Sequence, residues 1–360
     1  MTADPNVRTG TDPAGEAGTA LCLSGGGYRA ALFNAGGVLR LAEAGLLGRT
    51  TVLCGVSGGA IVAGLLAVRW ARLSSEAFSP AAVRREVLGP LRALVGRTLD
   101  GRSVVGGLLF PRSLTEWISH NFDRELYHGV QFGDLPTVPR VSIGASQLGS
   151  GHRVVFSNEA CSRAGAISIG DPSYPVTDAV CASIAMPPAL PALQVSESDL
   201  DGEARAMQLA DGMLCDPLAL ADARDCATVW ACDGGGTLLS DVPLDGKADQ
   251  AARAIEILQH SIRLGAADTL QASLRAGAHR GAFWSLRATT ADYPADTCLV
   301  CPPARAAELS ALPTRFSAMD AELQERLINW GYAICDIALR SDFDGALPRA
   351  TEFPFRDRGL

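Results

Sequence analysis

Two short apolar runs near the beginning of the chain are each followed by a glycine-rich turn and then by a longer segment. The short runs have strand length, and the longer segments carry apolar residues at helical spacing or over a helical length. The pattern therefore predicts a strand, a tight turn and a helix, twice in succession. The four segments are residues 19–23, 28–44, 51–56 and 60–70.

The same alternation continues through the rest of the chain, and it predicts an α/β protein. We expect three layers, α/β/α, with a mainly parallel central sheet that helices cover on both faces. Functional loops of such sheets lie at the carboxyl ends of the strands, where both glycine-rich turns belong. Further strands are expected at residues 138–145, 152–156, 207–210, 228–231 and 281–288, and long helices at residues 249–276 and 318–340.

Neither an internal repeat nor a domain linker interrupts this pattern, which predicts one domain over residues 20–345. A disordered tail is expected at residues 1–19, which lack the features of a secretory signal, and a C-terminal tail at residues 346–360. The acidic stretch at residues 196–203 is expected to be a surface loop. The longest uninterrupted apolar stretches, such as residues 60–68, fall short of the roughly 20 residues that span a bilayer. We therefore expect a cytoplasmic protein that is soluble or peripherally bound to membranes.

Composition and charge narrow the classes of ligand. The 360 residues are 48% hydrophobic and 19% charged, as in globular proteins. The net charge of -8 argues against a nucleic-acid partner, because phosphate binding needs clustered Lys and Arg. Ten cysteines without an export signal are expected to be thiols, most of them in the core. Cys298 and Cys301 form a lone C-x-x-C without a second pair or a nearby His, so we expect no metal.

One basic segment departs from the acidic average. Residues 69–112 contain eight arginines and three acidic residues, an excess of five positive charges. A solvated helical face accounts for such a segment. Since Leu, Val and Phe are interleaved with the arginines, a membrane-facing patch beside the active site is the alternative. The arginines are Arg69, Arg72, Arg84, Arg85, Arg92, Arg97, Arg102 and Arg112.

The second glycine-rich turn matches the nucleophile elbow G-x-S-x-G. In this motif, glycines permit a strained strand-to-helix turn that exposes the serine hydroxyl. The predicted strand before the turn and the predicted helix after it supply the context that the motif requires. The helix begins at the serine, so free N–H groups and the positive helix end face a developing negative charge. The motif consists of Gly55, Val56, Ser57, Gly58 and Gly59, with Ser57 as the candidate nucleophile.

The first glycine-rich turn is a candidate oxyanion hole. If the two strands pair, the N–H groups of Gly25, Gly26 and Gly27 point toward the same place as that of Gly58. Glycine is needed because a side chain would keep a substrate carbonyl away from the backbone. Arg29, two residues later, is interpreted as orienting the loop, as meeting a phosphate or as forming a structural ion pair.

A rival interpretation assigns the first turn to a dinucleotide. Gly25, Gly27 and Ala30 match G-x-G-x-x-A between a predicted strand and helix. That motif needs an acidic residue at the end of the second strand to hold the ribose. Ser57 between glycines stands there instead, so the sequence favours the hydrolase interpretation.

Together these segments resemble the patatin-like phospholipases, whose pattern is a G-G-G-x-[RK] loop, a G-x-S-x-G elbow and a later Asp-Gly pair. The resemblance covers roughly residues 20–235 and includes a small-residue helix and proline turn at residues 178–188 before Asp211 and Gly212. Two departures add a side chain at a tight turn. Ala30 replaces the family's usual glycine, and Met213 stands where the family prefers Gly or Ala.

The resemblance implies a lipid acyl hydrolase of the phospholipase A or lysophospholipase type, with Ser57 as nucleophile and Asp211 as base. It implies phospholipids or other acyl-ester lipids as substrates and no metal or cofactor. Asp233, before three glycines, is a second candidate base, and His260 or His279 would complete a Ser-Asp-His triad instead. A ligand- or partner-regulated enzyme, or a catalytically silent lipid-binding scaffold, is the alternative function. The sequence indicates no oligomeric state.

Overall fold

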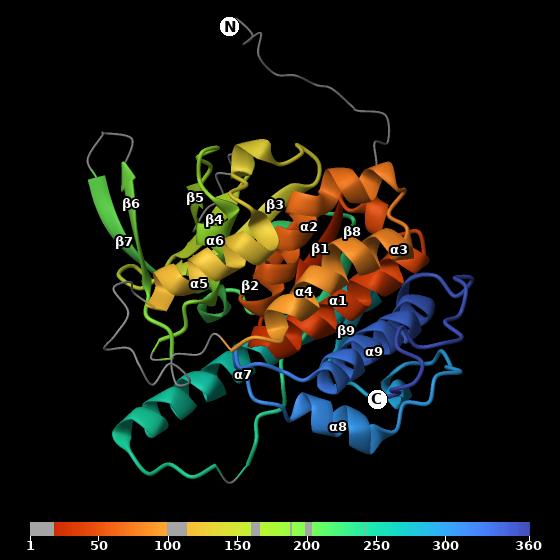
Figure 1. Ribbon diagram of the computed structural model, residues 1–360. Helices are drawn as coiled ribbons and strands as arrows, with labels where there is room; N and C mark the ends of the chain where they lie inside the picture. Colours follow the sequence, from red (N-terminus) through yellow and green to blue (C-terminus); the bar gives the residue numbers. More distant parts are fainter. Residues whose placement is uncertain (1–17, 99–113, 160–165, 188, 199–203, 241) are drawn as a thin grey trace, which may run out of the picture.

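The strands form one mixed, mainly parallel sheet (Figure 1). The computed structural model describes the chain except residues 1–17, 99–113, 160–165, 188, 199–203 and 241. Within these residues the strand order is β5-β4-β3-β2-β1-β8-β9, and the β6-β7 hairpin joins β3 through β7. The strands are β1 (Thr19–Leu23), β2 (Val52–Val56), β3 (Arg140–Gln147), β4 (Arg153–Ser157), β5 (Ala166–Ile169), β6 (Leu193–Ser198), β7 (Ala204–Asp211), β8 (Thr228–Asp233) and β9 (Arg280–Ser285).

The direction of the strands divides the sheet into two parts. Pairs β1-β2, β2-β3, β1-β8 and β8-β9 are parallel and form the centre, while β3-β4, β3-β7 and β6-β7 are antiparallel. The expected α/β fold with a mainly parallel sheet is confirmed. The α-helices are α1 (Gly27–Glu43), α2 (Gly58–Ser75), α3 (Pro80–Val83), α4 (Gly89–Val95), α5 (Leu114–Phe122), α6 (Val176–Ile184), α7 (Lys247–Arg275), α8 (Pro303–Ser310) and α9 (Ala321–Ala338).

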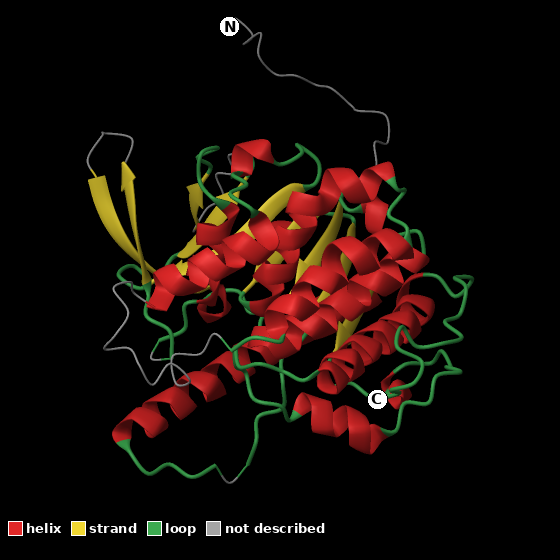
Figure 2. Ribbon diagram, in the orientation of Figure 1, coloured by secondary structure: helices red, strands yellow, loops and turns green. Residues whose placement is uncertain are grey.

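Two apolar clusters lie on opposite faces of the sheet. Because successive side chains of a strand point to opposite faces, Leu21 and Leu23 of β1 join the larger cluster, with α1, α2 and α9. Ala20 and Cys22 join the smaller cluster, with α7 and the segment at residues 213–226. Figure 2 shows the strands with helices packed around them, and α7 stands apart from the group that contains α1, α2 and α9.

Helix α1 is buried along almost its whole length, because α9 packs on it opposite the sheet. The two helices approach so closely that a Cβ on Gly331 would lie 2.0 Å from the carbonyl oxygen of Phe33. Arg40 of α1, also buried, forms a 2.8 Å ion pair with Asp336 of α9. The C-terminal helix α9 is therefore an integral part of the fold.

The structure corrects several expected boundaries. Thr19 is already in β1 and pairs with Thr228, so it is not part of a tail. Residues 196–198, expected in a loop, extend β6, because they pair with β7 in a hairpin; residues 199–203 lie outside the described residues. Strand β5 was not expected, since its four residues give too short an apolar run. Among the described residues, no helix has the length and apolar character needed to cross a membrane.

The C-terminal segment at residues 346–360 is not a free tail, because it packs against α9. The side chain of Asn329 donates to the carbonyl oxygens of Phe355 (2.9 Å) and Gly359 (2.8 Å) and accepts from the Phe355 N–H (3.0 Å). Ala350 and Leu360 are buried.

We expect Asn329→Ala to lower the free energy of unfolding by about 1–3 kcal/mol, because it leaves buried backbone groups unpaired. The C-terminal segment should then be cut by trypsin before the rest of the chain. Thermal unfolding and timed proteolysis measure both effects. Glu352→Ala, at an exposed residue of the same segment, is the matched control and should behave as wild type. If trypsin cut the C-terminal segment of the Asn329 variant as slowly as that of wild type, this account would be contradicted.

Candidate active site

Ser57 occupies a strained turn between β2 and α2, at the carboxyl edge of the sheet. Its φ of 52° and ψ of -127° lie where residues with a side chain are rarely found. The turn is pressed against the start of α1, since a Cβ on Gly58 would lie 2.2 Å from the carbonyl oxygen of Gly27. A Cβ on Gly59 would lie 2.0 Å from that of Leu23. The two glycines therefore permit a backbone contact that no other residue allows.

Two further contacts hold this elbow. The fully buried Ser183 of α6 accepts a hydrogen bond from the Ser57 N–H (2.9 Å) and donates one to the carbonyl oxygen of Gly144 (2.6 Å). Gly55 faces α2, and a Cβ there would lie 2.6 Å from that of Ala63. Sequence reasoning missed Ser183, because the small-residue pattern of its helix does not show which residue faces the turn.

The strand register brings Asp211 to Ser57. Val56, the last residue of β2, pairs with Gly144 of β3, and the next residue of β3, Ala145, pairs with Asp211. Strands β2 and β7 therefore pair with successive residues of β3. Because β7 ends at Asp211, this aspartate lies next to the elbow. The two residues are 154 positions apart in the sequence, so only the sheet makes them neighbours.

The backbone around Asp211 is fully engaged. Its N–H donates to the carbonyl oxygen of Ala185 (2.8 Å), and its carbonyl oxygen accepts from the Ser146 hydroxyl (3.0 Å). A Cβ on the following Gly212 would lie 2.2 Å from the carbonyl oxygen of Gly144. These contacts fix the direction in which the Asp211 side chain leaves β7.

Burial raises the pKa of Asp211 to about 7. The Met213 N–H, the Ser57 side chain and the charge of Arg263 lower this pKa, but they only partly offset the loss of water. The Met213 N–H donates to the carboxylate at 2.9 Å. A carboxyl group with this pKa is a far stronger base than an exposed aspartate, and it exchanges protons near neutral pH.

The first glycine-rich turn lies beside the elbow, at the start of α1. Gly26 and Gly27 have φ values of 142° and 64°, which glycine adopts without strain. In the described residues, the N–H groups of Gly25 and Gly26 donate no hydrogen bond to the protein. The N–H of Gly58 is in the first turn of α2, where helices leave donors unpaired. These donors face the same edge of the sheet as Ser57.

Arg29 ties the start of α1, next to this loop, to two segments that are distant in the sequence. It is buried and donates to the carbonyl oxygens of Gly234 (3.3 Å) and Leu312 and to the Thr314 hydroxyl (3.0 Å). Burial, together with the positive charge of Arg263, lowers its pKa to about 9, so the guanidinium stays charged at neutral pH. Of the three interpretations of Arg29, the contacts favour loop orientation over phosphate binding or an ion pair.

Asp233 has a different environment from Asp211. It is fully buried, and its carboxylate forms ion pairs with Arg263 (2.9 Å) and Arg287 (2.7 Å) and accepts from the Gly235 N–H (2.9 Å). Burial raises the pKa of this carboxyl, but the two guanidinium groups outweigh burial and hold it below the ordinary value. The geometry therefore makes Asp233 a structural ion-pair partner.

The two candidate histidines lie elsewhere. His260 interacts with Arg287 (3.4 Å), and its pKa is lowered by burial and by the nearby guanidinium groups. His279 is hydrogen-bonded to Ser273 (2.6 Å) and to the carbonyl oxygen of Arg224 (3.2 Å). Among the described hydrogen bonds, neither imidazole reaches the candidate nucleophile or the adjacent aspartate. The geometry does not support a histidine triad.

Met213 and Arg263 close the site, and sequence reasoning did not place them there. The Met213 thioether lies against the turn, since a Cβ on Gly25 would be 2.3 Å from its sulfur and 2.5 Å from the Cβ of Ser57. Arg263 of α7 donates to the carbonyl oxygen of Gly25 (3.3 Å) and lies 3.7 Å from the same sulfur. The sequence carried two signals for these positions. Met213 departs from the family pattern, and Arg263 is a lone cation on the apolar face of its helix.

The arginine-rich segment begins at the end of α2 that points away from this site. Arg72 follows Gly58 by 14 residues along α2, so it lies about 21 Å from the elbow. Five of the six described arginines form ion pairs, which favours a solvated helical face; Arg102 and Arg112 lie outside the described residues. The pairs join Arg69 and Arg72 to Glu86, Arg85 to Glu76 and Glu86, Arg92 to Glu325, and Arg97 to Glu125.

The cysteines behave as core residues for the most part. Six of the nine described cysteines are buried, and Cys298 is the exposed one of the C-x-x-C pair. In the part of the chain that the structure describes, no three His, Cys, Asp or Glu side chains are placed to hold a metal ion.

The fold and this site define an α/β protein with a serine at a nucleophile elbow and a buried carboxyl beside it. The family model for patatin-like phospholipases matches residues 21–224, which is more than half of the chain. The chain therefore belongs to the patatin-like phospholipase family, whose members are generally serine hydrolases. No curated protein matches it.

Two solved structures are similar to the chain. The crystal structure of VipD from Legionella pneumophila is 16% identical over 91% of this chain and 68% of that chain, with a TM-score of 0.41. The crystal structure of the type III effector protein ExoU is 22% identical over 48% of this chain and 40% of that chain, with a TM-score of 0.27.

The buried carboxyl predicts a gain in stability when its charge is removed. The pKa of Asp211 is raised from 3.8 to about 7 in the fold, so wild type loses stability as the pH rises between these values. Asp211→Asn does not ionise, and it should raise the Tm by several degrees at pH 8 and by much less at pH 5. Calorimetry of both proteins at both pH values measures the difference. A lower Tm for the variant at pH 8 would contradict the environment described for Asp211.

Proposed function

We propose that this protein hydrolyses acyl esters of lipids through an acyl-enzyme on Ser57, with Asp211 as the general base. The observation that carries the proposal is a buried carboxyl whose pKa is about 7, next to a serine at a strained elbow. A base is most effective when its pKa is close to the working pH, because it is then both ionised and basic. Family membership supports a lipid as the substrate.

The proposed reaction has two halves. The Ser57 oxygen attacks the ester carbonyl while Asp211 takes the hydroxyl proton, and the negative charge gathers on the carbonyl oxygen. The N–H groups of Gly25, Gly26, Gly27 and Gly58 would stabilise that oxyanion. The intermediate expels the alcohol, which takes the proton from Asp211 and leaves an acyl-serine. Water then attacks, gives its proton to Asp211, and the fatty acid leaves as Ser57 regains its proton.

The position of Met213 favours a second form of the same function, a regulated hydrolase. Its sulfur lies against Gly25 and beside Ser57, where a substrate carbonyl has to enter. Methionine is unbranched and flexible, so a rotamer change opens the site without moving the backbone. A lipid, a ligand or a partner protein that stabilises the open rotamer would raise activity. A catalytically silent scaffold would keep the closed rotamer throughout.

The nucleophile and the base are tested by substitution. Ser57→Ala should abolish labelling by a serine-directed phosphonate, and Ser57→Ala and Asp211→Asn should each lower kcat for a soluble short-chain ester by about 10³-fold or more. His260→Gln is the control and should retain activity, because this imidazole contacts Arg287 and not Ser57 or Asp211 in the described hydrogen bonds. Circular dichroism checks the fold of each variant. A folded Asp211→Asn protein with near-normal turnover would refute the assignment of the base.

The pH dependence offers a separate check. Because Asp211 has to be ionised to accept the proton, kcat/KM for a soluble ester should rise with pH through about 7 and then level off. Below that pH the carboxyl is protonated and cannot act as a base. Initial rates measured between pH 5 and pH 9 test for this rise of kcat/KM with pH. A rate that is already at its plateau at pH 5 would indicate a base other than this buried carboxyl.

A further inference from the structure

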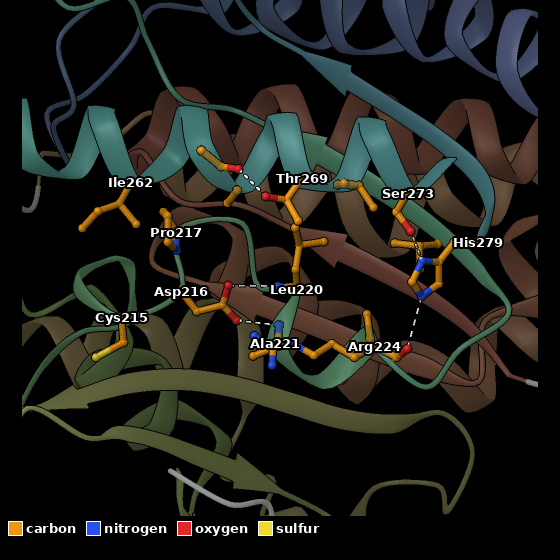
Figure 3. Close-up of a pocket in the computed structure, with 15 residues that line it drawn as sticks. Cys215, Asp216, Pro217, Leu220, Ala221, Arg224, Ile262, Thr269, Ser273 and His279 are labelled. Carbon is orange, nitrogen blue, oxygen red and sulfur yellow. Dashed lines mark hydrogen bonds between the residues drawn. The ribbon is translucent and has the colours of Figure 1, made fainter. Parts of the chain in front are cut away.

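A groove runs along α7 on the face of the sheet that carries the smaller apolar cluster. It has a volume of about 640 Å³ and lies between α7 and the segment at residues 215–224 (Figure 3). Its lining extends along the helix from Ile262 to Ser273, eleven residues, so the groove is about 16 Å long. A groove of this length fits an extended chain better than a compact headgroup.

One end of the groove adjoins the candidate active site. Figure 3 shows Cys215, Pro217 and Ile262 at one end and His279 at the other. Cys215 follows Met213 by two residues, and Ile262 precedes Arg263, which donates to the carbonyl oxygen of Gly25. Both walls of the groove therefore lead to the oxyanion turn.

Met213 lies between the groove and the nucleophile. On one side its sulfur touches the turn that contains Gly25, beside Ser57. On the other side it belongs to the same apolar cluster as Ala223, Val229 and Leu270, which line the groove.

The polar side chains of the groove are largely occupied by the protein itself. Asp216 accepts from the N–H groups of Leu220 (3.0 Å) and Ala221 (2.8 Å). Thr269 donates to a carbonyl oxygen of its own helix, and His279 pairs with Ser273 (Figure 3). What the groove offers a ligand is therefore mainly the apolar surface of Leu, Ile, Val, Ala and Pro side chains.

Gly265 keeps the groove open at its middle. It lies inside a 29-residue helix, where glycine is less favourable than alanine, and it lines the groove. No atom lies within 4 Å of the position that a Cβ would take, so helix packing does not require a glycine here. Gly265 is exposed, so a larger side chain there would occupy space in the groove without displacing packed atoms.

We propose that this groove is the acyl-chain subsite, which holds the fatty acyl chain of the ester while its carbonyl lies at Ser57. The inference rests on the proposed hydrolase function and adds where the chain of the lipid goes. With the Met213 rotamer changed, the chain would pass from the oxyanion turn along α7. Burial of the methylene groups would give longer chains a higher affinity, because each one removes apolar surface from water.

A direct binding experiment does not depend on turnover. Ser57→Ala protein should bind the fluorescent polyene fatty acid cis-parinaric acid, and Gly265→Leu in the same background should weaken binding by about tenfold or more, because the added side chain fills the groove. Ser261→Leu, an exposed substitution one turn away on α7, is the matched control and should bind as tightly as the parent. Gly265→Leu should also raise the Tm, so weaker binding cannot come from misfolding.

A chain-length series tests the subsite in the active protein. For Gly265→Leu, the ratio of kcat/KM for a dodecanoate ester to that for a butanoate ester should fall by about tenfold, while Ser261→Leu keeps the wild-type ratio. An unchanged ratio and unchanged probe binding, in a protein that hydrolyses both esters, would overturn the subsite and leave the hydrolase intact. Binding that depends on Gly265 in a protein that hydrolyses neither ester would refute the proposed function and support the groove as an acyl-binding site.

Discussion

The contact between the two glycine turns at the carboxyl edge of β1 and β2 sets the geometry of everything around it. The backbone of Gly58 lies against the carbonyl of Gly27, and any side chain at Gly58 would collide with that oxygen. This contact presses the strained Ser57 turn onto the start of α1, so the two glycine-rich turns lie side by side. Helix α9 packs on α1 from the other side and holds that helix against the sheet.

Electrostatics then separates two aspartates that are both followed by glycine. Asp211 and Asp233 are both buried at strand ends, so both lose the solvation that favours the charged form. For Asp233, the positive charges of Arg263 and Arg287 compensate for the lost solvation, and the pKa of this carboxyl stays below its ordinary value. Asp211 has no cation of comparable strength, so its pKa rises to about 7. The same arginine, Arg263, thus forms an ion pair with Asp233 and acts on Asp211 only through its charge, as the smallest of the causes that lower the pKa of Asp211.

Helix α7 connects the candidate active site to the face of the sheet that carries the smaller apolar cluster. Arg263 donates to the carbonyl oxygen of Gly25 in the first glycine-rich turn and touches Met213, and further along the same helix Gly265 lines the groove. One helix therefore carries the roof of the site and one wall of the proposed acyl subsite. Movement of α7 would change both together, which would couple the candidate site to the groove.

The sequence by itself determined the order of the strands and helices in the chain, because periodicity is a local property. The strand at residues 19–23 and the elbow around Ser57 were visible because each depends on neighbours in the chain. The short strand β5 and the hairpin strand β6 were not, because their short or polar sequences show no clear apolar run and only pairing with β4 and β7 defines them.

Tertiary structure decided which polar groups meet. The sequence offered Asp211, Asp233 and two histidines as partners for Ser57, and only the register of β2, β3 and β7 places one carboxyl beside the elbow. The pKa of that carboxyl depends on how much water the fold excludes, which no motif encodes. Met213, Arg263 and Gly265 gained their roles in the same way, from the packing of α7 on a turn more than two hundred residues earlier in the chain.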